Sequence, residues 1–186
     1  MVPTSERGSP STSVTDSTPE AAPQARGERS VTVLSVELSP TTATGYARLA
    51  FHQMLGVADR LGDERVNERP IAPHVNSVAS LVVHCCGVAE YWLGHVGVGR
   101  PSDRDRDAEF TTTASVAELH ERVGTCLVQM EADLAAIDAG IASPQADGLL
   151  LLQVAPGDPA SLVVHVIEEL FQHLGHCEIA ADALTA

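Results

Sequence analysis

Lysine is absent from this 186-residue sequence, and all 11 of its basic residues are arginines. A reaction that begins with a lysine Schiff base, or that uses lysine as a general base, is therefore excluded. Acidic residues number 25, so the formal net charge is −14. Because a nucleic-acid-binding surface needs clustered basic side chains to neutralise phosphates, the sequence predicts no nucleic-acid partner.

Aromatic residues, long apolar runs and export signals are also scarce or missing. Phe, Trp and Tyr make up 3% of the chain, so we expect a core built from Leu, Val, Ala and Ile. No run approaches the roughly 18 apolar residues of a transmembrane helix. The N-terminal segment also lacks the apolar stretch of a signal peptide. We therefore expect a cytoplasmic protein with no membrane partner.

The cysteines contain no CxxC pair; they are Cys85, Cys86, Cys126 and Cys177. Side chains of adjacent residues on a helix point about 100° apart, so a bridge between Cys85 and Cys86 is not expected. We interpret all four as reduced packing residues, in line with a cytoplasmic location.

The chain divides into a tail and one domain. Residues 1–30 are rich in Ser, Thr and Pro and have no apolar run, which predicts a disordered tail. Residues 31–186 are the predicted domain, long enough for a single hydrophobic core. Residues 31–38 (VTVLSVEL) are β-prone, but the sequence offers no second strand to pair with them.

Four helices are predicted in the domain, over residues 41–61, 77–95, 115–137 and 158–183. Prolines predict a loop over residues 67–74, charged residues predict another over 97–113, and residues 140–157 join the last two helices. Four helices of similar length indicate an all-α four-helix bundle, whose binding sites project inward from facing helices. The spacing in the first helix predicts these inward-facing residues: Leu49, Met54, Leu55, Ala58 and Leu61.

Three helix boundaries have specific signals. Gly62, followed by Asp, predicts the end of the first helix. Ser115 and Glu118 have the spacing of a capping box at the start of the third. Asp158 precedes a proline, which predicts the N-cap and first residue of the last helix.

The last helix carries a polar stripe on an otherwise apolar rod. His165, Glu169, His173 and His176 follow one another at spacings of four, four and three, which places them on one side. A buried stripe of this kind must be satisfied by hydrogen bonds or by a metal ion. Glu169 and His173, four residues apart, can reach one ion together.

A further histidine, His84, lies inside the apolar run LVVHCCGV of the second helix. With Glu169 and His173 it would form a two-histidine, one-carboxylate metal site whose other positions stay open to water or substrate. A hydrogen-bonded polar cluster is the alternative. His165 is a better candidate for packing than for a fourth ligand, and His176 would support a ligand or line a substrate site.

Two segments carry a resemblance to a known family: SVASLVVHCCGVAEYWLGH in the second helix and HVIEELFQHLGHCEIAADAL in the last. Over about residues 41–184 the chain resembles the DinB/YfiT-like metal-binding four-helix-bundle proteins. The resemblance implies the metal ligands His84, Glu169 and His173. Many members have histidine where this chain has Glu169. In having glutamate there, the chain is similar to the mycothiol-dependent maleylpyruvate isomerases and mycothiol S-transferases. RDRDAEF, residues 104–110, also looks like actinobacterial members.

The resemblance implies a metal-dependent thiol transferase with a role in detoxification. Zinc is the preferred metal, with nickel or iron as alternatives, and a mycothiol-like thiol is the expected co-substrate. Maleylpyruvate isomerases usually carry an additional C-terminal domain, so the shorter S-transferases fit better. The expected partners are a small-molecule thiol and an electrophile, and family members often pair as homodimers.

Four residues are candidates for lining the substrate site: His176, Tyr91, Arg104 and Arg106. Three of them have a structural alternative: Tyr91 could anchor the core, and neighbouring aspartates could neutralise Arg104 and Arg106 in a solvated loop. Two alternative functions also stay open. One is a non-catalytic, stress-linked metal-binding bundle, and the other is a thiol-dependent isomerase or biosynthetic enzyme.

Overall fold

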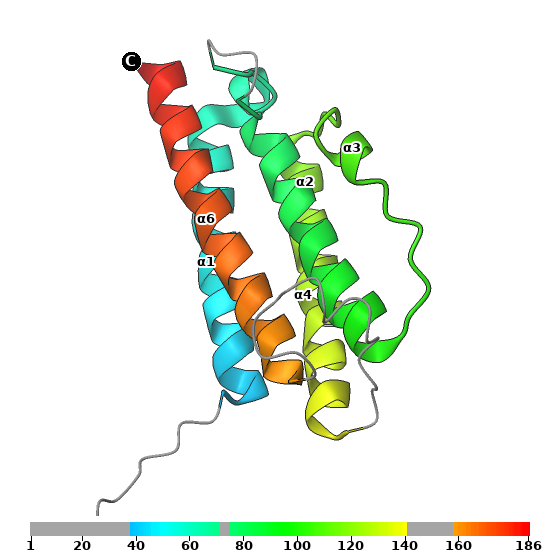
Figure 1. Ribbon diagram of the computed structural model, residues 1–186. Helices are drawn as coiled ribbons and strands as arrows, with labels where there is room; N and C mark the ends of the chain where they lie inside the picture. The colour runs from blue at the N-terminus through cyan, green and yellow to red at the C-terminus, as the bar shows by residue number, and fades with distance from the viewer. Residues whose placement is uncertain (1–37, 71–74, 141–157) are drawn as a thin grey trace, which may run out of the picture. The chain divides into compact units, whose positions relative to one another are not determined.

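The computed structural model describes residues 38–70, 75–140 and 158–186, and these residues form helices and no strand (Figure 1). The predicted all-α bundle is confirmed. The predicted disordered tail, the β-prone residues 31–37 and nearly all of the connection 140–157 lie outside the described residues. The described elements are α1 (Pro40–Arg65), α2 (Val78–Ala89), η1 (Glu90–Gly97), α3 (Arg106–Glu109), α4 (Val116–Asp138) and α6 (Pro159–Thr185).

Each long helix begins at a side chain that accepts a hydrogen bond from a free backbone N–H of the first turn. Ser39 caps α1, and Ser77 caps α2. Ser115 forms the predicted capping box with Glu118 at the start of α4. Asp158 caps α6 immediately before a proline, as predicted. These caps satisfy N–H groups that the helix itself leaves unpaired, so they fix where each helix begins.

The four long helices of the described part run in two directions. The ends of α1 and α6 meet, because the Arg65 guanidinium donates a hydrogen bond to the Leu184 carbonyl. The start of α4 lies beside the end of α1, where the Val116 N–H donates to the Asp63 carboxylate over 2.6 Å. α1 and α6 therefore run one way while α2 and α4 run the other (Figure 1). Both α1 and α2 pack against α4 and α6.

Because α2 and α4 are parallel, the loop between them must travel the length of the bundle (Figure 1). The sequence predicted only a loop over residues 97–113, and this was wrong in one respect. The loop contains the short helix α3, which Asp105 caps by accepting hydrogen bonds from the N–H groups of Asp107 and Ala108 over 3.1 and 3.0 Å. An aspartate cap of this kind starts a turn locally, within a segment too polar to show helical periodicity.

Two other helix predictions need correction. The end predicted at Gly62 is a kink: Gly62 has a φ of 65°, but helical hydrogen bonding resumes and α1 continues to Arg65. The second helix covers the predicted range but changes to a π-helix at Glu90. There the Arg100 guanidinium packs where a β-carbon on Gly94 would lie, and the Arg100 N–H donates to the Gly94 carbonyl over 2.9 Å.

The buried core is made mainly of Leu, Val and Ala, and Phe51 is the fully buried aromatic of the described residues. The expected contribution of Ile is smaller than predicted, because Ile137 and Ile167 are only partly buried at the edge of the core. Leu49 is 47% exposed, so its predicted inward position is wrong. It lies five residues before the buried Met54, which places it about 140° away around the helix.

Phe51→Ala is expected to destabilise the bundle by about 3–5 kcal/mol, because it removes a fully buried ring and leaves a cavity. Leu49→Ala, on the same helix, is expected to change the unfolding free energy by no more than about 0.5 kcal/mol. Urea unfolding of both variants measures the difference. Equal effects would contradict the assignment of Phe51 to the core and Leu49 to the surface.

Candidate metal centre

The three residues predicted as metal ligands come together in the structure. One ligand atom from each of His84, Glu169 and His173 lies within 4.8 Å of the other two. His84 comes from α2, and the other two come from successive turns of α6, where His173 Nε2 lies 3.3 Å from Glu169 Oε2. The two imidazole rings meet edge to face with centroids 4.8 Å apart. The three side chains therefore converge on one point, because Glu169 and His173 lie one turn apart on α6 and His84 reaches them from α2.

The pKa shifts of His84 and Glu169 suit the binding of a cation. Burial lowers the pKa of His84 below its ordinary value, and the nearby His173 lowers it further, while a hydrogen bond with Glu109 acts in the opposite direction. The hydrogen bond from His173 lowers the pKa of Glu169, so its carboxylate stays ionised near neutral pH. Metal binding requires neutral imidazoles and ionised carboxylates. Two nitrogens and one carboxylate oxygen are a donor set that zinc, nickel and iron all accept.

The group opens onto a cleft of about 480 Å³. His84 is 2% exposed, but the side chains of His173 and Glu169 are 15% and 26% exposed, so the open side of the group lies on α6. The predicted substrate-site residues Tyr91, Arg104 and Arg106 line this cleft. Its complete lining is His84, Val88, Tyr91, Trp92, Arg104, Arg106, His165 and Glu169.

His176 is absent from this lining and contacts a candidate ligand instead. Its Nδ1 lies 3.3 Å from His173 Nδ1, a hydrogen bond in which one ring donates and the other accepts. The two ring centroids are 5.3 Å apart. Since His173 Nε2 faces Glu169, the contact with His176 occupies the opposite nitrogen of the same ring.

His165 lies one turn before Glu169 and packs against Trp92 edge to face, with centroids 4.9 Å apart. Its Nδ1 is 3.6 Å from the Glu168 carboxylate. One ligand atom each from His165, Glu168 and Glu169 also lies within 4.8 Å of the others, but Glu168 is exposed. His165 thus forms part of the wall of the cleft, next to the three candidate ligands.

The two arginines have different environments. Arg106 lies over the ring of Phe110, 5.2 Å from its centroid, and in the described residues no carboxylate pairs with it. Arg104 is mostly buried and makes two hydrogen bonds to Glu109, from Nε over 2.6 Å and from Nη2 over 2.9 Å. The aspartates of the loop were the expected partners of Arg104, but Glu109 takes their place.

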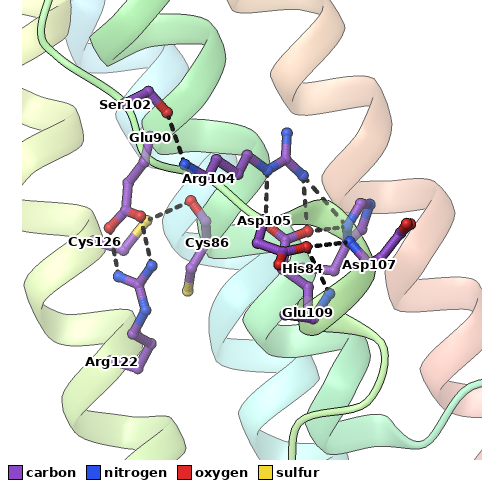
Figure 2. Close-up of polar contacts among 11 residues, drawn as sticks. His84, Cys86, Glu90, Ser102, Arg104, Asp105, Asp107, Glu109, Arg122 and Cys126 are labelled. Atoms are coloured by element: carbon purple, nitrogen blue, oxygen red, sulfur yellow. Dashed lines mark hydrogen bonds and ion pairs between the residues drawn. The ribbon is translucent and has the colours of Figure 1, made fainter.

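Sequence reasoning missed Glu109, whose carboxylate Oε2 also lies 2.7 Å from His84 Nδ1 (Figure 2). Glu109 is one of four acidic residues within seven positions of the loop, so nothing in the local pattern separates it from its neighbours. One indirect signal was available. Gly87 interrupts the apolar second helix, and a β-carbon there would lie 2.1 Å from Glu109 Oε1.

A second cavity of about 380 Å³ shares Tyr91 and Arg104 with the lining of the first cleft. The arginines that line it are paired within the protein. Arg100 pairs with Asp133. Arg104 pairs with Glu109, and Arg122 pairs with Glu90 (Figure 2). The positive charge on its walls is therefore already balanced by carboxylates.

The cysteine side chains are all buried, as expected, and none forms a disulfide. Burial raises the pKa of Cys85 well above its usual 9.0 and that of Cys177 to about 12. The pKa of Cys86 is raised first by a hydrogen bond with Cys126 and then by burial. Since the thiolate is the reactive form of cysteine, these residues are poor nucleophiles at neutral pH.

At pH 8 we expect Ellman's reagent to modify none of the four thiols of the native protein within minutes, and all four after unfolding. Stability should also fall between about pH 9 and 12. In that range the unfolded chain loses its thiol protons while folded Cys177 keeps its own, so ionisation favours unfolding. Urea unfolding across this range measures the slope, and Cys177→Ala should make it shallower. A rapidly modified thiol, or an unchanged slope in the variant, would contradict the assignment.

None of the helices in the described residues is both long enough and apolar enough to cross a membrane.

Comparison with models of known protein families identifies the family of this chain. The family model of the mycothiol S-transferases matches residues 44–185, a range that includes every candidate ligand. No curated protein matches, and neither does any solved structure. The resemblance to DinB-like, mycothiol-dependent proteins drawn from the sequence is confirmed by this match. Because the match covers most of the sequence, the chain belongs to the mycothiol S-transferase family.

Proposed function

We propose that this protein is a metal-dependent thiol transferase that joins a low-molecular-weight thiol to an electrophilic carbon. Membership of the mycothiol S-transferase family supports the thiol-transferase function and names mycothiol as the first candidate thiol. The single observation that carries the metal-dependent mechanism is the convergence of His84, Glu169 and His173 at the edge of an open cleft.

These three residues would hold one divalent cation, and zinc is the first candidate. Bond lengths of about 2.0–2.2 Å place ligand atoms roughly 3–4 Å apart around such an ion, so small side-chain rotations would close the present separation. When bound, the cation would lower the pKa of a thiol and so supply a thiolate at neutral pH. Two histidines and one carboxylate leave coordination positions free for an exchangeable ligand.

The chain's own residues support a nucleophile that arrives with the co-substrate. The sequence has no lysine, and the pKa values of Cys85, Cys86 and Cys177 are raised. In the proposed reaction the thiol sulfur forms a bond to the electrophilic carbon and the leaving group departs with its electron pair. The thiol proton passes to solvent. Tyr91 would pack against the substrates, and Arg106 would bind an acidic group on one of them.

Metal content tests the site directly. The protein purified without added metal is expected to contain close to one zinc, or another divalent metal, per chain. His84→Ala should lose it, because the remaining pair of residues from α6 offers too few ligands. His120→Ala is the matched control, since His120 is half-exposed and pairs with Asp59 on α1. Elemental analysis measures all three, and a chelator should lower the melting temperature of the native protein by several degrees.

The site assignment would be wrong if the native chain, folded and metal-free, took up neither zinc nor nickel on addition. Equal metal content in His84→Ala and His120→Ala would also contradict it.

Glu169→Gln is expected to reduce thiol-dependent consumption of a generic electrophile, such as monobromobimane, by at least about 100-fold. Loss of a metal that stabilises developing charge by several kcal/mol has an effect of this size. Glu168→Gln, the neighbouring exposed glutamate, is the matched control and should stay within about twofold. The assay compares mycothiol with glutathione at equal concentration. A metal-loaded native protein that shows no thiol-dependent turnover with any thiol tested would favour the non-catalytic alternative.

A further inference from the structure

We infer that Glu109 is a positioning residue that holds His84 with Nδ1 protonated and leaves Nε2 as the nitrogen available to the cleft. The part of this inference that concerns a metal rests on the proposed function. The part that concerns the orientation and tautomer of His84 stands on the contacts of Glu109 alone. Glu109 contacts His84 and Arg104 (Figure 2), and it fills the space beside Gly87 of α2.

The first contact defines the proton on His84. Glu109 Oε2 lies 2.7 Å from His84 Nδ1, whereas Arg104 Nη2, the other polar atom near that nitrogen, is 3.4 Å away. A carboxylate that already binds a guanidinium accepts hydrogen bonds and does not donate them. The proton between the two residues therefore belongs to Nδ1. A neutral imidazole that donates from Nδ1 has its lone pair on Nε2, the form in which histidine binds metals through that atom.

The second contact fixes the carboxylate. Arg104 donates to both oxygens of Glu109, over 2.6 and 2.9 Å, in the parallel arrangement that restricts a carboxylate to one plane. The Arg104 guanidinium in turn lies 5.6 Å from the centroid of the Tyr91 ring. The backbone N–H of Arg104 donates a hydrogen bond to Ser102 Oγ over 3.3 Å. The side chain of Glu109 is 9% exposed, so little water competes for these bonds.

The third contact comes from α2 itself. Gly87 is three residues beyond His84, on the adjoining turn, and a β-carbon there would lie 2.1 Å from Glu109 Oε1 and 2.9 Å from Glu109 Cδ. Real β-carbons do not approach other atoms so closely, so only glycine leaves room for this carboxylate. Glycine is unfavourable inside a helix compared with alanine. Its presence here is explained by the space that Glu109 needs.

The short helix α3 delivers both Glu109 and the residue after it. Phe110 packs on the His84 ring with centroids 4.5 Å apart and an interplanar angle of 32°. The Arg69 guanidinium donates to the Phe110 carbonyl, which ties this turn to the segment between α1 and α2. His84 is thus held at its Nδ1 edge by a hydrogen bond and on one face by a ring.

Glu109→Gln tests the inference, with Glu90→Gln as the matched control. Glu90 is also an Arg-paired carboxylate next to the second cavity, but it contacts no candidate ligand. Zinc affinity, measured by competition with a chromophoric chelator, is expected to fall about 10–100-fold in Glu109→Gln and to stay within twofold in Glu90→Gln. Equal affinities in the native protein and Glu109→Gln would overturn the role of Glu109 at the metal site.

A second measurement needs no metal and separates this inference from the proposed function. Nitrogen-15 NMR of the metal-free protein reports the histidine tautomers, and His84 is expected to carry its proton on Nδ1 in the native chain and in Glu90→Gln. In Glu109→Gln the population of the other tautomer should rise. A native His84 protonated on Nε2 would overturn the inference, whatever metal the protein binds. A native protein that binds no metal but shows the expected tautomers would overturn the proposed function and support the positioning contact.

Gly87→Ala provides an independent route to the same result. A methyl group at this position should displace the Glu109 carboxylate and shift the His84 tautomer in the same direction as Glu109→Gln, even though alanine favours the helix. Gly175→Ala on α6, where a β-carbon meets no atom within 4 Å, is the control and should leave the tautomer unchanged. An unchanged tautomer in Gly87→Ala, in a correctly folded protein, would contradict the inferred contact.

Discussion

A histidine buried within an apolar helix must have its polar atoms satisfied, and much of this structure follows from that requirement. His84 is 2% exposed on α2, and Glu109 satisfies its Nδ1. Glu109 can reach it only because the loop before α4 crosses the bundle and folds into α3. Arg104 then balances the charge of the carboxylate, and Gly87 gives it space. The need to satisfy one buried ring therefore explains the Arg104–Glu109 ion pair and the glycine at position 87.

The direction of the helices explains why a residue of a loop can reach His84 in the middle of α2. In a bundle whose successive helices are antiparallel, short turns would join neighbours and few residues would pass across the middle of a helix. Here α2 and α4 are parallel, so the chain must return along the bundle between them (Figure 1). That return places α3 against α2 at the level of His84. The long connection contributes side chains to the site as well as joining two helices.

The sequence was sufficient for the features that depend on local chemistry. Caps such as Ser115 and Asp158 predicted helix starts, and the spacing of Glu169 and His173 predicted which side chains share a face. Features that depend on distant partners were missed. The choice of Glu109 over three nearby aspartates is decided by the position of His84, and the π-helix at Glu90 lies where Arg100 packs on Gly94. A local sequence pattern indicates neither the contact of Glu109 with His84 nor that of Arg100 with Gly94.

The protonation states of the buried thiols and of Glu169 indicate which groups of the chain can act at the cleft. Burial keeps the Cys85 and Cys177 thiols protonated, while a hydrogen bond keeps Glu169 ionised at the open edge of the cleft. The cysteine sulfurs are thus confined to the core, while the Glu169 carboxylate and the His84 imidazole line the open cleft. In the reaction proposed above, a protein thiol at the cleft would compete with the small-molecule thiol for the electrophile and for the metal. Keeping the protein's own thiols in the core removes that competition, which suits a protein whose family transfers a thiol that comes from outside the chain.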